Sequence, residues 1–87
     1  MFKPFYNDKF IKAYDKLPLS IQRKVDKQIK FLLQDLRYPS IRAKKLEGFP
    51  DVWEGRVDRS YRFIFIIKND VVTFIGVGPH DEGLGKK

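Results

Sequence analysis

Cysteine is absent from this chain of 87 residues, and histidine occurs only once, at position 80. The absence of cysteine excludes disulfides, a thiol nucleophile and a cysteine-based zinc site, and it is typical of a protein from a reducing cytosol. A single histidine excludes a metal site built from several histidines. We therefore predict a protein that acts without a metal or another cofactor.

Long hydrophobic runs and familiar catalytic motifs are missing as well. No segment approaches the ~20 apolar residues that span a bilayer, and the first residues lack the pattern of a signal peptide. The sequence contains no Gly-rich phosphate loop and no serine nucleophile elbow. We expect a cytoplasmic protein that does not act at a membrane.

The composition indicates a small, basic, folded protein. Hydrophobic residues make up 43% of the chain and aromatic residues 15%, which predicts one domain over residues 1–87 with a single thin core. Eighteen Lys and Arg residues against eleven Asp and Glu residues give a net charge of +7. Such an excess favours phosphate-rich or acidic partners. A basic surface that is merely solvated is the alternative.

The N-terminal part predicts a strand followed by a helix. Residues 2–6 alternate loosely between aromatic and polar positions, and Pro4 restricts this strand to a sheet edge or to a strand start. Asn7 or Asp8 can cap the helix that follows, and Pro18 ends it. The apolar stripe of this helix consists of Phe10, Ile11, Tyr14 and Leu17.

A second helix gives the clearest periodic pattern, and Ser20 is a plausible cap for it. Apolar residues recur in it at intervals of three and four, at Ile21, Val25, Ile29, Leu32, Leu33 and Leu36. Because the link between the two helices is short, they are expected to form an antiparallel helical hairpin. For the cations on the outer face, a solvated surface is favoured over a nucleic-acid contact; they are Arg23, Lys24, Lys27 and Lys30.

The second half of the chain predicts an antiparallel strand meander. A basic segment, residues 37–45, contains four cations and no acidic residue. Residues 52–57, 61–67 and 71–77 are rich in aromatic and β-branched residues and indicate strands, with a tight turn at residues 68–70. Together with the helices, these strands predict an α+β fold.

The two-residue period of a strand assigns side chains to the two faces of the meander. One face carries Trp53, Gly55, Val57, Tyr61, Phe63 and Phe65, of which Trp53, Phe63 and Phe65 are predicted core. The other face carries Glu54, Arg56, Asp58, Arg62, Ile64 and Ile66. Arg56 and Arg62 can therefore lie on one face, unless a bulge in the link at residues 58–60 changes the alternation.

The charged face and His80 together suit metal-free cleavage of RNA. In that reaction the ribose 2′-hydroxyl is the nucleophile, and the protein needs only a base, an acid and cations that stabilise the phosphate. His80 follows the last strand, and an imidazole can donate or accept a proton near neutral pH. An ordinary surface histidine is the alternative.

The guanidinium groups of Arg56 and Arg62 could bind a phosphate in fork geometry. Glu54 lies two residues before Arg56 on the same face, where it could accept the proton of the 2′-hydroxyl. The competing interpretation is that the arginines form ion pairs with Glu54 or Asp58. For Glu54, an ion pair with Arg56 is slightly favoured over a catalytic role. Trp53 could stack on a base, but a place in the core is favoured.

Three segments, in order, carry a family resemblance: residues 44–57 (KKLEGFPDVWEGRV), 60–65 (SYRFIF) and 78–84 (GPHDEGL). Following a strand and a basic helical hairpin, they resemble the RelE/ParE toxin superfamily. The resemblance implies a helical hairpin packed on a twisted antiparallel sheet, and a toxin neutralised by an acidic antitoxin. RelE-like toxins cut mRNA on the ribosome, so ribosome and mRNA are implied partners; ParE-like toxins instead poison DNA gyrase.

Matched position by position, the resemblance implies a site. Arg62 in SYRF and Arg56 in the preceding strand are expected to stabilise the transition-state phosphate. His80 matches the C-terminal histidine of YafQ-like and YoeB-like toxins, which transfers a proton. Lys44 and Lys45 lie where relatives carry basic residues that contact RNA, and the same basic segment adds Arg42 as an RNA-binding residue.

The chain departs from the family pattern at three positions. Glu54 stands where RelE has a lysine, Gly76 replaces a strand arginine of YafQ-like proteins, and Leu84 replaces a terminal aromatic residue. The implied catalytic set is therefore Arg62, His80, Arg56 and Glu54. A non-catalytic module that binds an antitoxin or RNA is the alternative.

Overall fold

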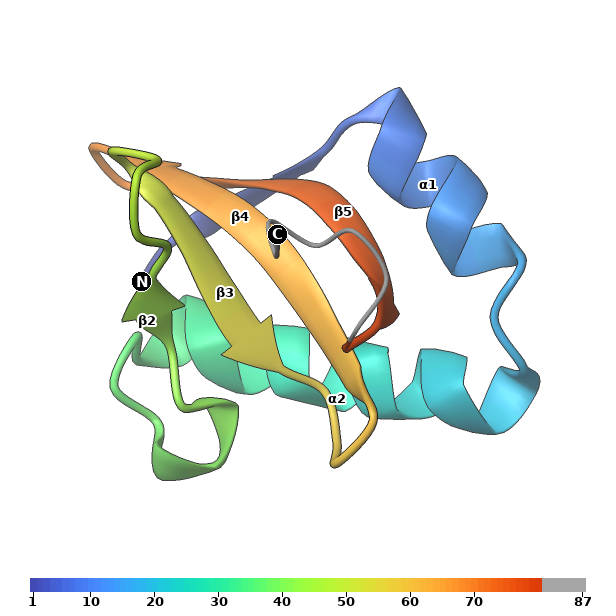
Figure 1. The fold of residues 1–87 in the computed structure, drawn as a ribbon. Coiled ribbons are helices and arrows are strands. Elements are labelled where there is room, and N and C mark those ends of the chain that lie inside the picture. The colour runs from blue at the N-terminus through green and yellow to red at the C-terminus, as the bar shows by residue number, and fades with distance from the viewer. Residues whose placement is uncertain (81–87) are drawn as a thin grey trace.

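A five-stranded sheet with two helices packed on one face forms the fold (Figure 1). The computed structural model describes residues 1–80. The elements confirm the predicted α+β class, with an N-terminal strand and a helical hairpin on a sheet. In chain order they are β1 (Lys3–Tyr6), α1 (Asp8–Asp15), α2 (Leu19–Gln34), the 3-10 turn η1 (Pro39–Ile41), β2 (Lys44–Lys45), β3 (Val52–Arg56), β4 (Tyr61–Lys68) and β5 (Val71–Pro79).

The strands follow the order β1-β5-β4-β3-β2 across the sheet. Strands β3 to β5 form the predicted antiparallel meander, and β2, which was not predicted, extends it. Strand β1 pairs with β5 in parallel and makes the sheet mixed. Parallel pairing is possible here because the chain passes from β1 through both helices and the rest of the meander before β5 runs beside β1. Pro4 lies in this edge strand, where the loss of one ladder donor is tolerated.

The two helices begin in different ways. In α1 the side-chain oxygen of Asn7 accepts a hydrogen bond from the Phe10 N–H at 2.8 Å, which confirms one of the two predicted caps. The predicted cap Ser20 is wrong, because α2 begins at Leu19, so Ser20 lies inside its first turn and Pro18 occupies the cap position. The Pro18 carbonyl accepts hydrogen bonds from the N–H groups of residues 21 and 22, so the first turn closes without a side-chain cap.

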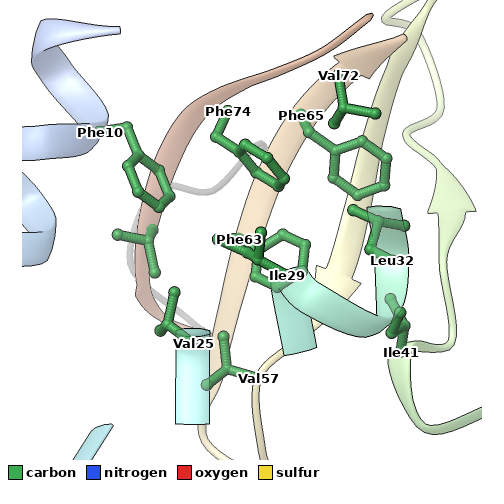
Figure 2. Close-up of a cluster of buried hydrophobic side chains, with 11 residues drawn as sticks. Phe10, Val25, Ile29, Leu32, Ile41, Val57, Phe63, Phe65, Val72 and Phe74 are labelled. Carbon is green, nitrogen blue, oxygen red and sulfur yellow. The ribbon is translucent and has the colours of Figure 1, made fainter. Parts of the chain in front are cut away.

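The core lies between α2 and the sheet (Figure 2). Three phenylalanine rings of the sheet meet there at centroid distances of 5.6, 5.7 and 6.0 Å, in tilted and edge-on arrangements that aromatic rings favour. Trp53 packs against this core and stacks on Phe65, which confirms the predicted face assignment. The large side chains buried in the core are Val25, Leu32, Ile41, Phe63, Phe65, Val72 and Phe74.

A bulge in β5 resets the faces of the last strand. Ile64 pairs with Gly76 whereas the next residue, Phe65, pairs with Phe74, so Ile75 is an extra residue on the β5 side. Residues 58–60, where a bulge was also possible, instead form the turn between β3 and β4. After the bulge, Gly76 lies on the same face of the sheet as the predicted active residues.

The basic segment at residues 37–45 is more structured than its sequence indicates. It contains η1 and the two-residue strand β2, which pairs with β3 and completes the sheet edge. These elements hold three of the predicted RNA-binding residues beside the meander. Within the described range, no helix combines the length and the apolar character needed to cross a membrane.

Candidate active site

A depression of about 290 Å³ lies on the sheet face opposite the helices. Six of the seven residues predicted to act on RNA line it, and only Lys45 is not among them. The depression therefore collects the predicted cations, the carboxylate and the imidazole in one place. Its lining consists of Arg42, Lys44, Glu54, Gly55, Arg56, Arg62 and His80.

Strand pairing brings these side chains together. Arg56 of β3 lies directly opposite Arg62 of β4, and Glu54 of β3 lies opposite Lys44 of β2. Two cations at opposed positions of a sheet repel each other. An anion bound between Arg56 and Arg62 would relieve that repulsion, as a phosphate group would.

Arg62 is held by the turn that precedes it. Its Nη1 atom donates to the backbone carbonyls of Asp58 at 2.6 Å and Tyr61 at 3.0 Å. A guanidinium group has five N–H donors, and within residues 1–80 those on Nε and Nη2 make no hydrogen bond, so they can bind a ligand. The tethered side chain is thereby oriented before any substrate binds.

Asp58 organises the same turn. Its Oδ1 atom accepts from the N–H groups of Ser60 at 2.8 Å and Tyr61 at 2.9 Å, and its Oδ2 atom lies 3.1 Å from Lys24 Nζ. Burial acts to raise the pKa of Asp58, but these hydrogen bonds and the ammonium outweigh it and hold the pKa below its ordinary value. Asp58 thus pairs with Lys24, and the suggested ion pair with Arg56 is not formed.

The turn also anchors His80. The His80 N–H donates to the Ser60 carbonyl at 2.6 Å, next to the carbonyls that hold Arg62. The Nδ1 atom of the imidazole is buried and has no hydrogen-bond partner within residues 1–80. Leaving a buried polar atom unpaired is costly, so a polar ligand in the depression could stabilise this ring.

Glu54 is buried, and its carboxylate lies 3.8 Å from Lys44 Nζ. Within residues 1–80, Glu54 forms an ion pair with Lys44 and none with Arg56. The alternative interpretation of Glu54 as the ion-pair partner of Arg56 is therefore wrong. Gly55 separates Glu54 from Arg56, and a Cβ atom at this position would lie 2.5 Å from the Phe63 ring. The glycine lets the core approach the strand that carries both residues.

Lys45 lies on the other side of the sheet. It pairs with Trp53 in the β2–β3 ladder, and its ammonium lies 5.7 Å from the centre of the Trp53 ring. This cation–π contact is on the face of the core, away from the depression. Its predicted contact with RNA therefore stays a prediction, separate from the site.

Gln28 supports the site but is not among the residues predicted for it. Its buried amide donates to the carbonyls of Ser40 at 3.1 Å and Arg56 at 2.8 Å, and its oxygen accepts from the Ser40 hydroxyl at 3.0 Å. It thereby joins α2, η1 and β3. The available signal was a polar residue inside the apolar stripe of α2, between Val25 and Leu32.

Of the two departures from the family pattern at Gly76 and Leu84, the structure describes only the position of Gly76. A Cβ atom at Gly76, which the resemblance aligns with an arginine of YafQ-like proteins, would meet no atom of residues 1–80 within 4 Å. Leu84 lies outside the described residues. Within residues 1–80, His, Asp and Glu side chains form no group of three that could hold a metal ion.

Comparison with known proteins gives a match in fold. No protein-family profile and no curated protein sequence matches the chain. The RelE toxin in the RelE–RelB complex of Pyrococcus horikoshii is similar over 94% of this chain and 98% of its own, with a TM-score of 0.76 and 20% identity. The isolated E. coli RelE toxin is similar over 97% of this chain and 89% of its own, with a TM-score of 0.76 and 22% identity.

A toxin described as YoeB/ParE, from Agrobacterium tumefaciens, is similar over 91% of this chain and 99% of its own. Its TM-score is 0.79 and its sequence identity is 14%. The chain therefore has the fold of the RelE/ParE toxins. At these identities the likeness establishes the fold.

Proposed function

We propose that the protein is the toxin of a toxin–antitoxin pair and that it cleaves mRNA on the ribosome. The observation that carries this proposal is the depression lined by Arg56, Arg62, Glu54 and His80. These groups are the cations, base and acid that cleavage by a ribose hydroxyl requires. The resemblance to RelE-like toxins implies mRNA as the substrate, and the net charge of +7 favours binding of such a polyanion.

In the proposed reaction the 2′-hydroxyl attacks the adjacent phosphorus while the P–O5′ bond breaks. Glu54 accepts the proton of the 2′-hydroxyl, and His80 protonates the departing 5′-oxygen. Arg56 and Arg62 stabilise the negative charge that develops on the non-bridging phosphate oxygens. The products are a 2′,3′-cyclic phosphate and a 5′-hydroxyl, so the reaction balances without a further reactant.

Purified protein added to translating ribosomes should stop protein synthesis and leave mRNA fragments with cyclic phosphate and 5′-hydroxyl ends. An mRNA with a 2′-deoxyribose at one mapped cleavage position is the matched control. It lacks the nucleophile and should resist cleavage at that position only. Translation that stops while the mRNA stays intact would contradict the proposal, and DNA damage with intact mRNA would favour the gyrase-poisoning ParE branch.

We further propose that an acidic antitoxin binds the groove between the two helices and β1. This groove has a volume of about 470 Å³ and is lined mainly by apolar side chains: Tyr6, Phe10, Ile11, Tyr14, Ile29 and Leu33, with Asp26 and Lys30. Burial and the hydrogen bond to Asp26 raise the pKa of Tyr14 to about 12, so its hydroxyl stays a neutral donor. The apolar face of an amphipathic helix fits such a groove, and acidic residues flanking it would suit the basic protein.

Replacing Ile11 by glutamate should prevent capture of the product of the neighbouring gene when the two proteins are co-expressed. Ile11 is 44% exposed, so this change introduces a charge into the groove without opening the core. Lys9→Glu, on the exposed side of the same helix, is the control and should leave capture intact. If the unaltered protein captures no neighbouring product, or if both variants behave alike, the proposed groove is wrong.

A further inference from the structure

A second basic depression borders the candidate active site. It has a volume of about 630 Å³ and lies between α2, η1 and the end of β3. Arg42 and Arg56 line both depressions, so the two share a border. The remaining lining residues are Lys24, Lys27, Gln28, Pro39, Ser40, Val57 and Asp58.

The charges of this second depression favour an anion. Lys24, Lys27, Arg42 and Arg56 contribute four positive charges, and Asp58 is the one described acidic residue in the lining. The Asp58 carboxylate is already engaged, with two backbone N–H groups on one oxygen and Lys24 on the other. Four cations against one occupied carboxylate leave an uncompensated positive field at this place.

Hydrogen bonds hold the backbone segments that line this depression. The buried amide of Gln28 binds the backbone of Ser40 and of Arg56, the residue shared by the two depressions. Arg42 ends η1 with a φ of 50°, a left-handed conformation that an arginine rarely adopts. Its backbone is therefore held in an unusual conformation at the border of both depressions.

We propose that this second depression binds a phosphate of the same RNA strand whose neighbouring phosphate lies between Arg56 and Arg62. The inference rests on the proposed RNA substrate and extends it from one phosphate to a track along the strand. Lys24 and Lys27, which the sequence analysis interpreted as a solvated helix face, are then RNA-binding residues. Arg42 and Arg56 connect the two positions.

The test is binding of fluorescent single-stranded RNA in which every ribose is 2′-O-methylated, so that the strand binds but has no nucleophile. Lys24→Gln/Lys27→Gln should weaken binding of an octanucleotide by about 10-fold or more and lower the salt slope by about 0.7, which corresponds to one lost phosphate contact on a single strand. The matched control is Lys9→Gln/Lys12→Gln, with the same loss of charge on α1, outside both depressions. The control should change affinity by less than about 2-fold.

Length dependence separates the two depressions. A dinucleotide, which has one phosphate, should bind the Lys24→Gln/Lys27→Gln variant as it binds the unaltered protein. Equal losses in both double variants, or an equal loss for the dinucleotide, would overturn the inference. So would unchanged RNA binding with lost antitoxin capture, which would assign the depression to an acidic protein.

Two features keep the outcome interpretable. Lys24 pairs with Asp58, so Lys27→Gln alone, compared with Lys12→Gln, repeats the test without breaking that ion pair. Because methylated RNA reports binding only, the second depression can be supported in a protein that does not cleave RNA. Conversely, a protein that cleaves RNA but shows no length dependence retains the proposed function and loses this inference.

Discussion

Replacing Arg62 by alanine should lower the rate of mRNA cleavage by about 100–1,000-fold, the usual effect of removing one preorganised donor from a developing oxyanion. The carbonyls of Asp58 and Tyr61 hold Nη1, which fixes the direction of the remaining donors before substrate binds. A side chain oriented in advance has little to reorganise in the transition state. Cleavage of a defined mRNA by programmed ribosomes, followed over time, measures the loss.

Two variants test the reason for that loss. Arg62→Lys keeps the charge but has no fork, so it cannot hold the turn and a phosphate at once and should recover only a small part of the rate. Arg59→Ala removes an exposed arginine of the same turn that does not line the depression, and it should cleave normally. Equal rates for Arg59→Ala and Arg62→Ala would reduce the role of Arg62 to general charge. Thermal unfolding by circular dichroism shows whether each variant is folded.

Strand periodicity predicts the part of the candidate site that lies on β3 and β4. In β3 and β4 the alternation is regular and the connecting turn is short, so the face of Glu54, Arg56 and Arg62 follows from position alone. The core face follows in the same way, because Trp53 of β3 and Tyr61, Phe63 and Phe65 of β4 occupy alternate positions along their strands. The prediction that Arg56 and Arg62 can lie on one face is therefore confirmed, and the structure places them directly opposite each other.

Other parts of the site depend on contacts that periodicity does not encode. A strand of two residues is too short for its alternation to be recognised in the sequence. That Lys44 and Lys45 lie on opposite faces of the sheet is therefore seen only from the pairing of β2 with β3. The bulge at Ile75 is indicated only indirectly, by core residues Phe74 and Val77 spaced three apart. The Gln28 amide finds its partners 12 and 28 residues away in sequence. Long-range pairing decides each of these features.

Replacing His80 by alanine should lower the cleavage rate by about 100–10,000-fold, the range expected when a general acid or base is removed. His80 is held at the depression by its backbone bond to Ser60, so the alanine variant should keep the strand end and lose only the imidazole. His80→Gln is the matched control. It keeps a polar side chain that cannot transfer a proton at neutral pH, and it should be as slow as the alanine variant.

The assigned role of His80 as the acid can be separated from that of Glu54 as the base by changing the leaving group. An mRNA with sulfur in place of the 5′-bridging oxygen releases a thiolate, which needs no proton because thiols are much stronger acids than alcohols. This substrate should restore most of the rate of His80→Ala and little of the rate of Glu54→Gln. Rescue of Glu54→Gln instead would exchange the two roles. Rescue of neither would mean that His80 acts by binding the substrate, since a binding defect is indifferent to the acidity of the leaving group.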